Sequence, residues 1–303
     1  MLELKKICKH YGDIEALHEF SLKMKNGLYG FLGENGAGKS TLIKILSCNL
    51  FPDSGKVLVD GEEIREMGER YRSMVGYVPQ ESVGYQNMRI REFMEYMAVL
   101  KGLNVGSLKV QREIMDILEK VHLAAHERKR FSELSGGMKR RLLFAQAVLG
   151  KPSILILDEP TAGLDPNERI AMRNLIAEEA MNKIVILATH VISDVECVAD
   201  QIIIMKSGEM IGCTTPEEWL AKAKGHVWEM VSSPENVSKI GQKYRISQIR
   251  QGQDGIHLRI VLDEVKQEEG FCEVMPSLDD VYLLFAACNE KMNSRNNNTE
   301  AFI

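Results

Sequence analysis

A glycine-rich segment that ends in a lysine and two hydroxyl side chains, GENGAGKST, spans Gly33–Thr41. It follows the apolar run YGFL and precedes the helical pattern TLIKIL, the order of strand, loop and helix that a phosphate-binding loop requires. Glycines let the backbone wrap closely, so that successive N–H groups converge on phosphate oxygens. Lys39 is expected to reach the β- and γ-phosphates of a nucleotide, and Ser40 to offer its hydroxyl to Mg²⁺. The expected nucleotide-binding residues of the loop are Gly33, Asn35, Gly36, Ala37, Gly38, Lys39, Ser40 and Thr41.

Two adjacent carboxylates, Asp158 and Glu159, follow a second apolar run in SILILDEP. They would lie at the carboxyl edge of an open α/β sheet, where such sheets bind ligands. Because neighbours along a strand face opposite sides, Asp158 can hold Mg²⁺ while Glu159 polarises an attacking water. The alternative is a solvated acidic pair that opens a turn at Pro160, and the phosphate-binding loop makes that alternative the weaker one.

A third segment, LSGGMKRRLLFAQAVL (134–149), places Lys139, Arg140 and Arg141 in the first turn of a predicted helix. A helix N-terminus already carries partial positive charge and unpaired N–H groups, so it favours an anion. The pattern predicts that an anion binds at Ser135, Gly136 and Gly137, whereas the arginines are expected mainly to brace or solvate the surface.

The elements that must position these residues alternate between strand and helix over the first 212 residues, which predicts an α/β fold. Apolar runs uninterrupted by polar residues are typical of parallel strands buried on both faces. The expected strands include 55–61, 153–159, 183–189 and 200–206, and the expected helices 39–48, 89–101, 107–122, 138–149, 167–181 and 191–199.

A boundary is expected at TTPEEW (214–219), so that the first domain spans 1–213 with a helical subdomain over about 82–150. Residues 214–290 are predicted to form a small α+β appendage of strands and two helices, with Trp219 and Trp228 in its core. The Asn-rich residues 291–303 are predicted to be disordered.

The 303 residues carry a net charge of −5, which gives no global footprint for nucleic acid. Six scattered cysteines indicate reduced thiols rather than a disulfide framework, and no apolar run approaches the ~20 residues that a membrane span needs. His122 and His126 have the spacing of a helical metal pair, but no third ligand is nearby, so structural or solvated histidines are favoured.

Over roughly residues 2–212, the motifs and their order resemble the nucleotide-binding subunit of ABC transporters. LSGGM (134–138) resembles the family signature, although Met138 stands where Gln is frequent and Glu34 stands where Pro is frequent. Four further residues resemble family positions: Tyr11, which stacks on adenine; Gln80, which links the Mg²⁺ site to the membrane partner; Asp165, in the loop between subunits; and His190, the switch histidine at the γ-phosphate.

The resemblance implies an ABC-type P-loop NTPase that binds ATP with Mg²⁺, with Glu159, His190, Gln80 and Asp165 in catalysis and Ser40, Gln80 and Asp158 at the metal. It also implies a head-to-tail homodimer, or a heterodimer with another ABC subunit, that drives membrane permease subunits from the cytoplasmic face of the cell membrane. PSLDDVYLLF resembles the C-terminal extension of the efflux-associated branch. The alternative is a soluble ABC ATPase that acts on ribosomes or DNA, but the single P-loop and the short segment between Gln80 and Ser135 disfavour it, and no nucleic acid partner is expected.

Overall fold

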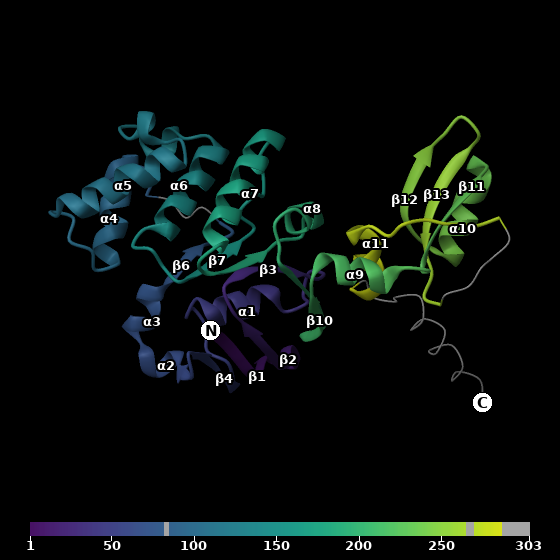
Figure 1. Cartoon of the computed structure of the whole chain (residues 1–303), viewed down its shortest axis with the longest axis horizontal. Helices are drawn as coiled ribbons and strands as arrows, with labels where there is room; N and C mark the ends of the chain where they lie inside the picture. The colour runs from purple at the N-terminus through teal and green to yellow at the C-terminus, as the bar shows by residue number, and fades with distance from the viewer. Residues whose placement is uncertain (82–84, 265–269, 287–303) are drawn as a thin grey trace. The chain divides into compact units, whose positions relative to one another are not determined.

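The structure, a computed structural model, describes residues 1–81, 85–264 and 270–286 (Figure 1). The chain divides into two compact units, Met1–Pro216 and Glu217–Ile303. The tail expected to be disordered, 291–303, lies outside the described residues. Within the described part of the chain, no helix combines the length and the apolar character of a transmembrane span.

A six-stranded sheet forms the centre of the first unit, in the order β10-β9-β3-β8-β7-β6. Its strands are β3 (Gly27–Leu32), β6 (Val75–Val78), β7 (Ile154–Asp158), β8 (Ile184–Ala188), β9 (Gln201–Lys206) and β10 (Glu209–Thr214). The strands from β9 to β6 pair in parallel, and β10 pairs antiparallel with β9 at one edge. Every residue of β7 and β8 is buried, which explains why both are uninterrupted apolar runs.

An antiparallel sheet, ordered β2-β1-β4-β5, forms the second layer. It contains β1 (Leu2–Tyr11), β2 (Ile14–Met24), β4 (Ser54–Val59) and β5 (Glu62–Glu63). The expectation that 55–61 is a parallel strand buried on both faces is therefore wrong. In β4 the first three residues are exposed and Val57, Leu58 and Val59 are buried, so only the second half of this antiparallel strand is covered.

Helix α1 (Lys39–Leu46) shares one hydrophobic core with both sheets. Four of its eight residues are buried, and Leu42 and Ile45 belong to the same cluster as Leu4 of β1 and Ile156 of β7. Packing of α1 against this core fixes its first turn close to the end of β3, and the glycine-rich loop connects the two elements.

The other helices of the first unit are α2 (Ile64–Met67), α3 (Glu69–Met74), α4 (Ile90–Leu100), α5 (Leu108–Lys120), α6 (Gly136–Val148), α7 (Pro166–Ala180) and α8 (Ile192–Glu196). Helices α4, α5 and α6 contact one another and lie side by side in Figure 1. Helix α6 begins two residues earlier than expected because the Ser135 hydroxyl caps it by accepting from Met138 N at 3.2 Å.

The second unit contains β11 (Val227–Ser232), α10 (Val237–Lys243), β12 (Arg245–Gln251), β13 (Ile256–Val261), β14 (Cys272–Glu273) and α11 (Leu278–Phe285). Its antiparallel sheet runs in the order β12-β13-β11-β14. A third helix, α9 (Pro216–Ala223), departs from the expected two, because PEEW opens a helix with Pro at its start rather than serving only as a boundary. Trp219 and Trp228 are buried, and Trp219 packs against Phe285.

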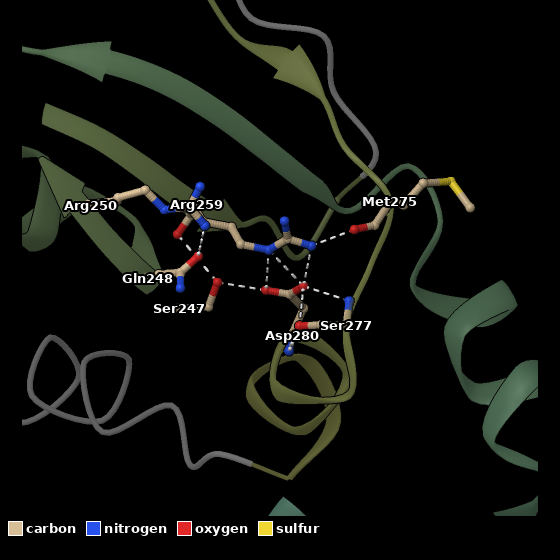
Figure 2. A network of polar contacts seen from close by, with 7 residues as sticks. All are labelled: Ser247, Gln248, Arg250, Arg259, Met275, Ser277 and Asp280. Carbon is tan, nitrogen blue, oxygen red and sulfur yellow. Dashed lines mark hydrogen bonds and ion pairs between the residues drawn. The ribbon is translucent and has the colours of Figure 1, made fainter. Parts of the chain in front are cut away.

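A buried ion pair fixes α11 to the sheet of this unit (Figure 2). Asp280 is fully buried and accepts from Arg259 Nε at 2.9 Å and Nη2 at 2.7 Å, while Ser247 Oγ and Ser277 N donate to the same carboxylate. Burial alone would raise the pKa of Asp280, but the hydrogen bonds from Arg259, Ser247 and Ser277 outweigh it and lower that pKa below its ordinary value.

Candidate functional site

The glycine-rich loop folds around the side chain of Lys39. The Lys39 ammonium donates to Gly33 O at 2.5 Å and to Glu34 O at 3.0 Å. Gly38 has a φ of +99°, and a Cβ there would collide with Ala16 O, so only glycine fits between the loop and β2. Burial lowers the pKa of Lys39, although the nearby carboxylates of Glu159, Asp158 and Glu34 partly restore it. A cation is therefore held at the N-terminus of α1, where a phosphate is favoured.

The two acids of SILILDEP lie at the carboxyl end of β7. Asp158 is the last residue of that strand, and burial together with the neighbouring charge of Glu159 raises its pKa. Glu159 has a φ of +51°, a left-handed backbone that costs a non-glycine residue roughly 1–2 kcal/mol. Its N–H donates to Ala188 O of β8 at 2.9 Å, so the neighbouring strand holds the turn that separates the two carboxylates.

The Glu159 carboxylate faces the segment that follows β8. Its Oε1 lies 2.8 Å from His190 Nδ1 and accepts from His190 N at 2.9 Å, and its Oε2 accepts from Thr189 Oγ1 at 3.1 Å. An ionised carboxylate only accepts hydrogen bonds, so the contact pairs it with a proton on Nδ1. The Glu159 side chain is 10% exposed and that of His190 is 68% exposed, so the carboxylate orients a ring that solvent and ligands can reach.

A cavity of about 290 Å³ joins these groups. It is lined by Tyr11, Ile14, Ala16, Glu34, Asn35, Gly36, Gly38, Lys39, Ser40, Thr41, Gln80, Asp158, Glu159, Ala188 and His190. Ser40, Gln80 and Asp158 offer a hydroxyl, an amide and a carboxylate oxygen, a donor set that suits Mg²⁺. Within the described residues, no group of three or more His, Cys, Asp and Glu side chains is placed to hold a metal, and His122 and His126 form no such cluster.

The remaining predicted site residues do not line this cavity. They are Gly33, Ala37, Ser135, Gly136, Gly137 and Asp165. Gly33 and Ala37 shape the loop from behind: a Cβ on Gly33 would collide with Met205 O, and Ala37 O accepts from Gly208 N. Asp165 caps α7 by accepting from Glu168 N at 2.9 Å. Ser135, Gly136 and Gly137 form the start of α6, so the signature segment and the cavity are separate features of one chain.

The three cations after the signature are engaged within this chain. Arg140 donates to Pro79 O and Arg141 to Val121 O, each at 3.2 Å, and Lys139 lies over the ring of Phe131. The arginines thus brace the surface, as expected from the sequence. Glu168 of α7 lies beside the start of α6, where a Cβ on Gly137 would collide with its carboxylate.

Sequence reasoning missed five contributors to this region: Ile14, Ala16 and Ala188, which line the cavity, and Thr189 and Glu168, which lie against site residues. Ile14 and Ala16 line the cavity from β2, and only the fold brings that strand to the loop. Glu168 follows Asp165 by three residues, a spacing that predicts a helix cap but not the carboxylate's contact with Gly137. Thr189 could have been found, since it immediately precedes His190 in the motif ATH.

Comparison with known proteins gives matches over most of the chain. A sequence profile described as ABC transporter matches residues 17–162. An uncharacterized ABC transporter ATP-binding protein of Bacillus subtilis (strain 168) is 40% identical over 213 residues, or 69% of each chain. Nod factor export ATP-binding protein I of Rhizobium etli is 32% identical, with 74% of this chain and 71% of that protein covered. A solved dimer of an ATP-binding cassette in a post-hydrolysis state, bound to ADP and Pi, has a TM-score of 0.64 at 26% identity and covers 71% of this chain and 98% of its own.

Proposed function

The chain belongs to the ATP-binding subunits of the ABC transporter family, which are ATPases, and from this premise we propose that it hydrolyses ATP between two copies arranged head to tail. The observation that carries the proposal is the separation of the two phosphate-binding features. The cavity holds Lys39, Asp158, Glu159 and His190, whereas the cap formed by Ser135 lies outside it. One chain therefore carries two halves of different sites, the cavity and the start of α6. In a head-to-tail dimer, the cavity of each copy would face the start of α6 of the other copy.

In the proposed site the loop and Lys39 bind the phosphates of ATP, and Tyr11 stacks on the adenine. Ser40, Gln80 and Asp158 would hold Mg²⁺, which would supply charge neutralisation at the phosphates of ATP. Glu159 accepts a proton from the attacking water, and His190 positions the γ-phosphate. Asp165 lies in the loop that faces the second copy.

The start of α6 supplies the opposite wall of each site. Its N–H groups at Gly136 and Gly137, the Ser135 hydroxyl and the helix dipole together favour a phosphate. The neighbouring Glu168 carboxylate is negative, but the Arg141 guanidinium 3.5 Å away pairs with it. Because Arg141 neutralises Glu168, the partial positive charge at the N-terminus of α6 remains available to bind the γ-phosphate of the second copy's ATP.

The assay for this proposal is sedimentation velocity of the Glu159→Gln variant with ATP and with ADP. We expect a dimer with Mg-ATP and a monomer with ADP, because only ATP brings the γ-phosphate that α6 contacts. Adding Ser135→Arg should abolish the dimer and leave ATP binding intact, whereas Ser238→Arg on α10 adds the same charge and bulk without effect. A Glu159→Gln protein that stays monomeric in saturating Mg-ATP would refute the homodimer and favour a different ABC subunit as the partner.

We also propose that the dimer powers membrane permease subunits at the cytoplasmic face of the cell membrane, in the direction of efflux. The relative named for Nod factor export and the sequence of the C-terminal extension support that direction. In this proposal residues 1–213 form the ATPase domain, with its helical subdomain at about 82–150, and 214–290 form the appendage. Co-purification with a permease, followed by ATP-driven transport in vesicles of known orientation, tests it; uptake rather than export, or co-purification with ribosomes or DNA instead, would overturn it.

A further inference from the structure

A second contact, fully buried, joins the two segments that carry Glu159 and His190. Thr161 and Asp194 are 1% and 0% exposed, and the Thr161 hydroxyl donates to Asp194 Oδ2. Thr161 follows Glu159 by two residues, and Asp194, in α8, follows His190 by four. Neither side chain lines the cavity. The two segments are therefore tied twice, once by the Glu159 carboxylate itself and once behind it.

The contact between Glu159 and His190 and the contact between Thr161 and Asp194 are expected to behave differently during ATP hydrolysis. The contact between Glu159 and His190 involves the groups proposed to react, so it must change when the carboxylate turns toward water. The contact between Thr161 and Asp194 involves no reacting group. It can hold the backbone of Glu159 in place while the Glu159 side chain changes partners.

The backbone around Glu159 needs such support because its left-handed conformation is unfavourable for a residue with a side chain. Thr161 also fixes the rest of the turn, since its carbonyl accepts from Leu164 N at 3.2 Å, one residue before Asp165. A shift of the Thr161 backbone would thus move Glu159 on one side and Asp165 on the other.

Asp194 is in turn held by α7. Its Oδ1 lies 3.7 Å from Arg173 Nη1, and the same guanidinium donates to Ser193 O at 3.2 Å. Oδ1 accepts no hydrogen bond within the described part of the chain, so the Thr161 hydroxyl is the one hydrogen-bond donor to the carboxylate side chain there. Loss of that hydroxyl would leave a buried carboxylate with only an ion pair, an arrangement that favours rearrangement of the turn.

We propose that Asp194 is a positioning residue for ATP hydrolysis, which acts through the Thr161 hydroxyl to hold Glu159 against His190. This inference rests on the role proposed above for Glu159. It predicts that the contact affects the chemical step and leaves ATP binding, which depends on the glycine-rich loop, unchanged.

A matched pair of variants, Thr161→Ser and Thr161→Ala, isolates the hydroxyl, because both lose the methyl group and only the second loses the hydrogen bond. We expect Thr161→Ala to lower kcat about tenfold relative to Thr161→Ser, with the dissociation constant of a fluorescent ATP analogue within twofold. Thr161→Val, close in volume to the native residue, should behave like Thr161→Ala. Thr214→Val, at a second buried threonine outside the cavity, is the control for a lost hydroxyl and should keep the turnover of the unchanged protein.

Parallel measurements on Glu159→Gln separate this inference from the proposed function. If Glu159→Gln turns over normally, the role of Glu159 is wrong and this inference falls with it. If Glu159→Gln is inactive but Thr161→Ala and Thr161→Ser have equal kcat, only this inference is overturned. An equal loss of kcat and ATP affinity in Thr161→Ala would also overturn it, since that result indicates a structural role. Single-turnover rates of Glu159→Gln with and without Thr161→Ala should be equal, because a positioning effect disappears once its target is gone.

Discussion

The side chain of Lys101 ends at the C-terminus of α6, and replacing Lys101 by Met should lower the stability of the first unit. Lys101 follows the last residue of α4, and its ammonium donates to the carbonyls of Gln146 at 2.8 Å, Ala147 at 3.0 Å and Leu149 at 2.7 Å. These carbonyls lie at the end of α6, where the backbone lacks helical partners. Lys101→Met keeps the unbranched apolar stem and removes only the donor.

The expected loss follows from the three bonds. At about 1 kcal/mol net for each, the free energy of unfolding should fall by roughly 3 kcal/mol at pH 7. Burial lowers the pKa of Lys101 from 10.5 to about 8. Between these two values the unfolded chain binds more protons than the folded one, so this group adds stability as pH rises. The difference between native protein and variant should therefore grow from pH 8 to pH 10, by at most about 1.4 kcal/mol per pH unit.

Urea unfolding at pH 7, 8, 9 and 10 measures both effects, and amide hydrogen exchange at residues 142–148 localises them to α6. Lys109→Met, on the exposed side of α5, is the control that loses a lysine charge without losing a buried contact. A loss below about 0.5 kcal/mol at pH 7 would contradict a net contribution from the three hydrogen bonds, and a difference that stays constant from pH 8 to pH 10 would contradict the lowered pKa of Lys101.

Three further predictions concern the nucleotide, the second unit and the boundary between the units. Lys39→Ala should weaken ATP binding while His190→Ala binds nearly normally and turns over slowly; equal binding defects in a fluorescent-nucleotide titration would contradict this division. Asp280→Asn should destabilise the second unit by about 3 kcal/mol, because the largely buried Arg259 guanidinium loses its counter-charge; an unchanged thermal unfolding midpoint would contradict it. A chain ending at Pro216 should fold and bind ATP, since every predicted nucleotide residue precedes it; lost near-UV dichroism would indicate a core shared with the second unit.

Local patterns predicted the parts of the fold that depend on neighbouring residues. The phosphate-binding loop, α1 and the acids at the end of β7 depend on short segments whose composition fixes their conformation. The apolar runs also predicted β7, β8 and β9, because strands buried on both faces need no partner of particular sequence.

Contacts between distant residues could not be predicted in the same way. Residues 55–61 have the composition of a buried strand, yet pairing with β1 places β4 in the antiparallel sheet. The contact of Thr161 with Asp194 and that of Lys101 with the end of α6 join residues 33 and 45–48 positions apart. No spacing rule covers such distances, and only the packing of the elements brings these groups together.

The ion pair of Arg259 and Asp280 also constrains how this sequence can change over generations. Loss of Arg259 leaves the fully buried Asp280 charge uncompensated, and loss of Asp280 leaves the largely buried Arg259 guanidinium unpaired, whereas joint replacement by apolar residues of similar volume removes both charges together. Substitutions at the two positions are therefore expected to be coupled, because each single replacement leaves one charge of the pair unpaired. In a library that varies both positions and is selected for folded protein, variants with a single replacement should be depleted. The folded variants that differ from the native pair should carry replacements at both positions.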